Sequence, residues 1–122
     1  MAGLSMGGMQ TINIGICESL DILSWFAAFS AAPTTYTAEQ ISKHLDNYPD
    51  YNINYFYNIC GTEDGIALAS SRAATTGLTS LTDKLIEDEN FLWQTLAGGH
   101  DFNIWYLGFY NFAQLAFRNP TE

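Results

Sequence analysis

The chain opens with Met1-Ala2-Gly3-Leu4-Ser5-Met6-Gly7-Gly8, a stretch that places glycines two residues to either side of Ser5. This Gly-x-Ser-x-Gly spacing is typical of a nucleophile elbow, a sharp strand-to-helix turn that lifts a serine hydroxyl clear of the sheet. Glycines permit the close backbone approach that such a turn needs. Because the following helix directs its first N–H groups at the site, the amide of Met6 is expected to be an oxyanion donor.

Two interpretations of this stretch remain open from the pattern alone. Five loosely specified residues also fit a Gly/Ser-rich turn at the start of a chain. An elbow needs a strand that leads into it, and here only four residues precede Ser5. If the elbow is real, we therefore expect the chain to begin in the middle of a fold, and the remaining sequence has to decide between the two.

The composition restricts the class of protein. A chain of 122 residues with 48% hydrophobic and 15% aromatic residues suffices for one packed domain. Its net charge of −9 would repel a nucleic-acid backbone or an anionic membrane, so neither is an expected partner. Neutral substrates such as carbohydrate esters fit better, although solubility alone also explains the acidity.

Hydrophobic periodicity predicts alternating strands and helices. Strands are expected over residues 24–30, 53–60 and 90–96. Helices are expected over residues 6–19, from 37 to about 47–49, over most of 66–87 with an interruption at Gly77, and over 103–117. Alternation of this kind produces a parallel sheet with helices on its faces, so the predicted fold class is α/β.

The inward faces of two helices can also be predicted. In the helix over 66–87, the expected face contains Leu78, Leu81, Leu85 and Ile86. In the last helix, the expected inward residues are Ile104, Leu107, Phe112, Leu115 and Ala116. The neighbouring aromatic residues are interpreted as core or as cover for the sheet rather than as a substrate platform; they are Trp105, Tyr106, Phe109 and Tyr110.

Three loops that follow predicted strands contain chemically useful side chains, namely Ser5, Asp64 and His100. Parallel strands place such loops at one edge of the sheet. The order Ser…Asp…His is the order found in α/β-hydrolases. We therefore expect His100 to act as the general base on Ser5 and Asp64 to orient His100.

Other residues compete for these roles. His44 is the other candidate base, but it lies in the middle of a predicted surface helix. Glu63, Asp50 and Asp101 compete with Asp64, although Asp101 adjoins His100 in sequence and is poorly placed to orient it. Asp64 also fits a simple turn before Gly65, and His100 also fits a loop histidine.

Trp105 follows the histidine loop and is retained as a candidate substrate-binding residue. No metal ion or cofactor is expected, because the two histidines are far apart and no ligand cluster is visible. Cys17 and Cys60 form neither a CxxC pair nor a zinc pattern. A disulfide between them stays open, and two buried thiols are favoured, one after the elbow and one at the end of a strand.

Four segments carry a resemblance to a known family: Ala2-Gly-Leu-Ser-Met-Gly-Gly-Met-Gln-Thr, Phe29-Ser-Ala-Ala-Pro, Cys60-Gly-Thr-Glu-Asp and Gly98-Gly-His-Asp-Phe-Asn-Ile-Trp. On these segments the chain resembles the feruloyl and acetylxylan esterases of the first carbohydrate esterase family, which are esterase D-like α/β-hydrolases. The resemblance implies that Ser5 is the nucleophile, Asp64 the acid and His100 the base. It also implies a secreted enzyme that hydrolyses feruloyl or acetyl esters of plant cell-wall xylan.

The resemblance covers only part of such an enzyme. The family places several strands, and a loop that donates the second oxyanion N–H, before the elbow. We therefore expect residues 1–122 to form one partial esterase domain, the C-terminal part of an α/β-hydrolase fold without its N-terminal strands. The resulting open sheet edge predicts self-association or a partner chain.

Three functions follow as hypotheses. The first is a serine esterase that acts on feruloyl or acetyl xylan through an acyl-enzyme intermediate. The second, within the same fold, is a thioester or small-ester hydrolase such as an S-formylglutathione hydrolase. The third is a non-catalytic fragment or a subunit that needs a partner chain.

Overall fold

Four parallel strands form one sheet in the computed structural model, which describes residues 1–116. The strands follow the order β1-β2-β3-β4 and are β1 (Ala2–Leu4), β2 (Trp25–Phe29), β3 (Tyr55–Gly61) and β4 (Phe91–Leu96). The middle strands β2 and β3 are almost completely buried, as continuous apolar strands of parallel sheets are. The predicted α/β class is confirmed, and the predicted strands match within two residues.

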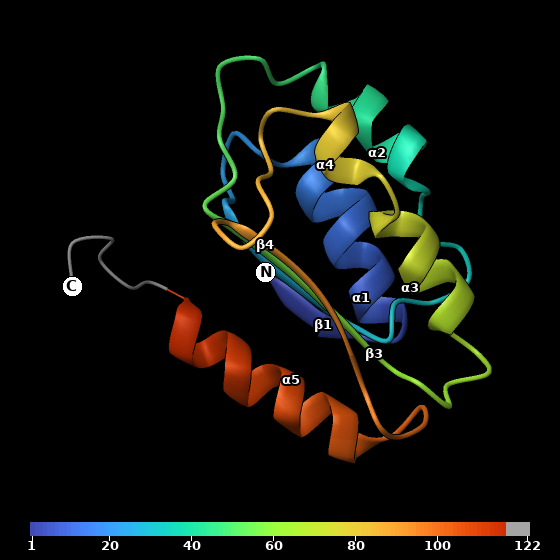
Figure 1. Ribbon diagram of the computed structural model, residues 1–122. Coiled ribbons are helices and arrows are strands. Elements are labelled where there is room, and N and C mark those ends of the chain that lie inside the picture. The colour runs from blue at the N-terminus through green and yellow to red at the C-terminus, as the bar shows by residue number, and fades with distance from the viewer. Residues whose placement is uncertain (117–122) are drawn as a thin grey trace.

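The helices divide between the two faces of the sheet (Figure 1). One face is covered by α1 (Met6–Gln10), its π-helical continuation η1 (Thr11–Ile16), α2 (Ala38–Leu45), α3 (Leu68–Thr75) and α4 (Leu78–Leu81). The other face is covered by α5 (Phe102–Leu115). Each face has its own hydrophobic core, and the core beneath α5 is the smaller of the two.

The start of α2 shows why this sequence forms a helix there. The Thr37 side chain accepts the amide of Gln40, and the Gln40 side chain accepts the amide of Thr37. This reciprocal capping box satisfies two N–H groups that a helix start leaves unpaired. The predicted helix start is therefore confirmed, while the helix ends at Leu45, slightly earlier than predicted.

The helix predicted over most of 66–87 is interrupted at Gly77, as expected, but the prediction that it continues to residue 87 is wrong. Gly77 adopts a left-handed conformation and separates α3 from the short α4, and the chain after Leu81 is no longer helical. Leu78 and Leu85 are buried, but Leu81 and Ile86 are exposed. The four residues share no face because residues 85 and 86 lie outside the helix.

The predicted inward face of the last helix is partly wrong. Ile104, Gly108 and Phe112 are buried at the four-residue spacing of a helix face, whereas Leu107 is exposed. Leu115 and Ala116 are half-buried, and residue 117 lies outside the described residues. The prediction that the helix aromatics cover the core fails for three residues, which are exposed: Tyr106, Phe109 and Tyr110.

The β1 edge of the sheet is open in the part of the chain that the structure describes. β1 pairs with β2 and has no second neighbour among residues 1–116. Its side chains Ala2 and Leu4 are exposed. Within the same residues, no helix has the length and apolar character needed to cross a bilayer.

Candidate active site

Ser5 lies on the sharp turn between β1 and α1. Its backbone has φ 55° and ψ −114°, a strained conformation for a residue with a side chain. Two contacts with the end of β2 hold it there: the Ser5 amide donates to the Phe29 carbonyl at 2.8 Å, and the Ser5 carbonyl accepts the Ala32 amide at 3.1 Å. The turn therefore places Ser5, which is half-buried, at the carboxyl edge of the sheet.

The glycines of the elbow have different roles. A Cβ on Gly3 would lie 2.3 Å from the Gly7 carbonyl oxygen, so β1 and the first turn of α1 approach each other only because residue 3 is glycine. A Cβ on Gly7 would meet nothing within 4 Å, whereas one on Gly8 would lie 3.1 Å from the Ala31 Cα. Of the two glycines that flank Ser5, Gly3 thus makes the close approach that the turn needs and Gly7 contributes its backbone, while Gly8 makes a second close approach.

Met6 occupies the first position of α1, where a backbone N–H has no acceptor within the helix. Its side chain is exposed and points away from the core. The amide follows the nucleophile directly, which is the position that the elbow geometry assigns to an oxyanion donor.

Asp64 is fixed in the turn after β3. Its Oδ1 accepts the backbone amides of Ile66 at 2.9 Å and Ala67 at 2.8 Å. Its Oδ2 accepts the His100 Nδ1–H at 2.8 Å, and its side chain is fully buried. Burial acts to raise the pKa of Asp64, but the hydrogen bonds from His100 and from the two amides outweigh it, so the pKa lies below its ordinary value.

The loop that carries His100 is joined to the loop that carries Asp64. The Gly98 carbonyl accepts the Glu63 amide at 2.9 Å, and a Cβ on Gly61 would lie 2.3 Å from that same carbonyl oxygen. The Thr62 amide also donates to the Leu96 carbonyl at 2.8 Å. The register of β3 and β4 and the small size of Gly61 therefore bring the two loops together.

The three predicted residues form one chain of hydrogen bonds. His100 Nε2 lies 3.0 Å from Ser5 Oγ, and His100 Nδ1 lies 2.8 Å from Asp64 Oδ2. The His100 side chain is 18% exposed, so solvent reaches the imidazole while the carboxylate is dry. With the proton on Nδ1, Nε2 is free to accept the serine proton, which is the arrangement that general-base catalysis requires.

The competing candidates lie elsewhere. Glu63 and Asp50 are exposed, and Asp101 caps α5 by accepting the amides of Asn103 and Ile104. His44 is in α2, where its ring stacks on Tyr36 with 5.0 Å between the ring centroids. None of these four side chains takes part in the hydrogen-bonded chain.

Two residues at the site were not among the sequence candidates. Ser30 Oγ accepts the Trp105 Nε1–H at 3.0 Å, and the Cys60 thiol donates to Asp64 Oδ2 at 3.5 Å. Both are completely buried. A sequence signal existed for both, because each lies at the end of a predicted strand that leads into the catalytic edge.

Both cysteines are buried free thiols, and no disulfide joins them. Burial raises the pKa of Cys17 to about 12, with Glu18 adding to the effect. Burial raises the pKa of Cys60 to about 11; Asp64 adds to it, and the hydroxyls of Ser71 and Ser30 oppose it. Both therefore stay protonated near neutral pH, which suits a packing role rather than a nucleophile.

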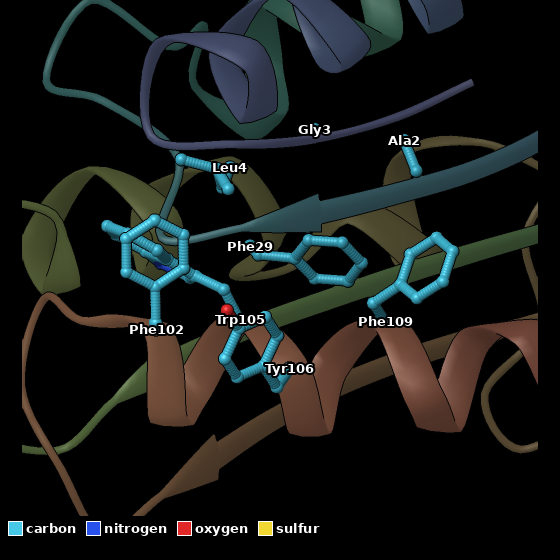
Figure 2. A pocket seen from close by; sticks show the side chains of 8 residues that line it. All are labelled: Ala2, Gly3, Leu4, Phe29, Phe102, Trp105, Tyr106 and Phe109. Carbon is cyan, nitrogen blue, oxygen red and sulfur yellow. The ribbon is translucent and has the colours of Figure 1, made fainter.

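An apolar groove of about 300 Å³ runs between β1 and α5 (Figure 2). Figure 2 shows the aromatic side chains of α5 on one side and the residues of β1 on the other. The lining residues are Ala2, Gly3, Leu4, Phe29, Phe102, Trp105, Tyr106 and Phe109. Across residues 1–116, no three His, Cys, Asp or Glu side chains gather in a way that would hold a metal ion.

Comparison with known proteins shows that the fold is similar to that of esterases. No family model matches the sequence. The CE1 ferulic acid esterase of the anaerobic fungus Anaeromyces mucronatus, solved without substrate, matches 93% of this chain with a TM-score of 0.72 and 25% identity. The same enzyme in complex with ferulic acid matches with a TM-score of 0.70 and 23% identity.

A more distant match shows the same fold. A Ser-to-Ala mutant of the feruloyl esterase module from Clostridium thermocellum, complexed with sinapinate, matches 91% of this chain with a TM-score of 0.56 and 18% identity. This chain spans 41% of the Anaeromyces structure solved without substrate and 42% of the Clostridium structure. The chain thus has the fold of CE1 ferulic acid esterases over less than half of their length.

Proposed function

We propose that this chain carries the catalytic triad of a serine carboxylic-ester hydrolase. The observation that supports the proposal is the unbroken hydrogen-bonded chain Ser5–His100–Asp64 at the carboxyl edge of a parallel sheet. His100 Nε2 takes the Ser5 proton while Oγ attacks the ester carbonyl carbon. The alcohol then leaves with the proton from His100, and the acyl group stays on Ser5.

Deacylation repeats these steps with water as the nucleophile and Ser5 as the leaving group. A water molecule gives its proton to His100 Nε2 and attacks the acyl carbonyl, and the carboxylic acid leaves as His100 returns the proton to Ser5 Oγ. Asp64 holds the imidazole in the correct tautomer and stabilises the imidazolium that forms in each half-reaction. No cofactor is required for either step.

The proposed substrates are feruloyl or acetyl esters of xylan. The matched esterases support the feruloyl choice, since two of these structures are complexes with ferulic acid and with sinapinate. The net charge of −9 is compatible with a neutral polysaccharide and unfavourable for polyanions. Because xylan is extracellular, the proposal also places the working enzyme outside the cell.

Among the described residues, the position of one backbone amide suits an oxyanion donor, and it is the amide of Met6. The resemblance to the esterase family implies a second N–H from a loop that precedes the elbow. Loss of a single oxyanion donor costs about 2.7–4 kcal/mol of transition-state stabilisation in a well-studied protease. We therefore expect hydrolysis by residues 1–122 alone to be slow.

Hydrolysis of methyl ferulate by the chain and by its variants tests the proposal. Ser5→Ala and His100→Ala should each remove turnover. When the wild-type chain alone has measurable activity, Asp64→Asn should lower kcat by about 10⁴-fold. Mass spectrometry should detect a feruloyl adduct on Ser5 in the wild type. Faster hydrolysis of S-formylglutathione than of methyl ferulate would favour a thioesterase instead.

A second candidate function is a subunit whose triad works only when a further polypeptide pairs with β1. It is favoured by the open edge of β1, by the apolar groove beside it, and by the greater length of the matched esterases. Equal, near-zero hydrolysis by the wild type and by Ser5→Ala would support this candidate over an enzyme that is active alone.

A further inference from the structure

Two hydrogen bonds fix the His100 ring only in part. They attach its two nitrogens to Ser5 Oγ and Asp64 Oδ2, and these two atoms lie at opposite sides of the ring. The ring can still tilt about the line between its nitrogens without breaking either bond. A third contact, outside the plane of the ring, is needed to set the tilt.

Trp105 provides such a contact. Its ring is perpendicular to the His100 imidazole, with an interplanar angle of 90° and 5.2 Å between the centroids. Phe102 makes a second edge-on contact with Trp105, with 4.9 Å between the centroids. These aromatic contacts prefer perpendicular geometries, so a fixed indole resists tilting of the imidazole.

The indole is itself fixed by a buried hydrogen bond. Trp105 Nε1–H donates to Ser30 Oγ at 3.0 Å. Ser30 is completely buried, has φ 54°, and donates its amide to the Ile59 carbonyl at 2.9 Å. The ends of β2 and β3 therefore fix the backbone of Ser30, and burial restricts its side chain, so the hydroxyl is held in place.

Cys60, at the end of β3, supports the acid of the triad. Its buried thiol donates to Asp64 Oδ2 at 3.5 Å, and the Ser30 hydroxyl acts to lower the pKa of this thiol. Ser30 therefore reaches His100 through its hydrogen bond with Trp105, and Cys60 adds a contact to Asp64. Supporting contacts of this type hold catalytic groups in the geometry that the reaction needs.

We propose that Trp105, anchored by its indole hydrogen bond to Ser30, is a positioning residue that holds the His100 ring in line between Ser5 and Asp64. The inference rests on the proposed esterase function. It assigns Trp105 a role that differs from the substrate contact expected from sequence, and it adds Ser30 as the anchor. The two roles make different kinetic predictions, since a substrate contact affects KM and a positioning contact affects kcat.

Ser30→Ala and Trp105→Phe break the same hydrogen bond from its two ends. In methyl ferulate hydrolysis, each should lower kcat by about tenfold to a hundredfold with KM nearly unchanged, as small misplacements of catalytic groups do. The double variant should be no worse than the more impaired single variant, because one contact is lost in both. Thr75→Val is the control: it removes a buried hydroxyl that bonds only to carbonyls of α3.

A second measurement does not need turnover. The NMR signal of the His100 Nδ1–H proton reports the hydrogen bond to Asp64, and His44→Gln assigns it because the chain contains two histidines. Exchange of this proton with water should become at least about tenfold faster in Ser30→Ala and in Trp105→Phe, and stay unchanged in Thr75→Val. Circular dichroism first confirms that each variant is folded, and if Trp105→Phe does not fold, Ser30→Ala decides alone.

The outcomes separate the inference from the proposed function. If the wild type shows no hydrolysis, an esterase that is active as this chain alone is ruled out, and the proton exchange still tests the position of His100. Unchanged exchange in the folded variants would overturn the inference. So would a rise in KM at constant kcat, which would make Trp105 a substrate contact.

Discussion

At the scale of single residues, Asp64 shows how this chain keeps a carboxylate charged in a dry position. One oxygen accepts two backbone amides, and the other accepts His100 and the Cys60 thiol. Hydrogen bonds to the charged form outweigh the desolvation that opposes it, so the pKa of Asp64 lies below its ordinary value. The amides come from the turn that opens α3, which makes the acid part of the local structure.

The lowered pKa of Asp64 predicts a pH dependence of stability. A carboxyl group whose pKa is lower in the folded state stabilises the fold above its unfolded pKa of about 3.9, and this contribution disappears as the pH falls toward the folded pKa. The free energy of unfolding of the wild type should therefore exceed that of Asp64→Asn at pH 7, and the difference should shrink below about pH 4. Urea unfolding at several pH values measures it.

A control separates this effect from general acid unfolding. Asp50→Asn removes an exposed carboxyl outside the triad and should unfold with the pH dependence of the wild type. A constant difference between wild type and Asp64→Asn from pH 7 to pH 3 would contradict the prediction.

The sequence predicts the three triad residues but not their supports. Ser5, Asp64 and His100 stand in the order and loops that the chemistry requires, and each carries a reactive group. Ser30 also ends a predicted strand at this edge, but the sequence does not show what its hydroxyl contacts, because that contact comes from the pairing of β2 with β3 and from the approach of α5. Contacts between residues 30 and 105 depend on tertiary packing, which hydrophobic periodicity does not encode.

At the scale of elements, the strands were more predictable than the helix faces. The apolar runs of β2 and β3 have few alternatives, so their positions follow from composition and length. In α5 most positions are aromatic or apolar, so periodicity does not define the inward face. Gly108 decides it: a Cβ there would lie 2.7 Å from Phe29 and 3.0 Å from Ile59, so the helix turns its glycine toward the sheet.

The junction of the acid and base loops predicts a sensitive glycine. Gly61→Ala would place a Cβ 2.3 Å from the Gly98 carbonyl oxygen, and backbone cannot yield as a flexible side chain can. We expect the free energy of unfolding to fall by about 1–3 kcal/mol. Because the two loops carry Asp64 and His100, kcat should also fall by about tenfold or more.

Gly65→Ala provides the matched comparison in the same turn. A Cβ on Gly65 would meet nothing within 4 Å, so its stability should stay within about 0.5 kcal/mol of the wild type. Thermal and urea unfolding measure both variants. Equal stability of Gly61→Ala and Gly65→Ala would show that the loop contact is less tight than the structure indicates.

For the whole molecule, two opposing effects act at the β1 edge of the sheet and at the groove beside it. The open β1 edge and the groove beside α5 expose apolar and hydrogen-bonding groups that favour association. The net charge of −9 opposes contact between two copies of the chain. Since salt screens charge repulsion but leaves apolar attraction in place, ionic strength should shift the balance toward association.

We therefore expect the 122-residue chain, studied alone, to self-associate through the β1 edge and the groove, and more strongly at high salt. Sedimentation velocity over a range of concentrations should show a rising average mass. Phe109 lies in the groove and is 59% exposed, so Phe109→Ser should weaken association by about tenfold or more. Ile22 is 77% exposed but outside the groove, so Ile22→Ser should leave association unchanged. A monomer at every concentration and salt level, or equal weakening by both variants, would contradict association through the groove.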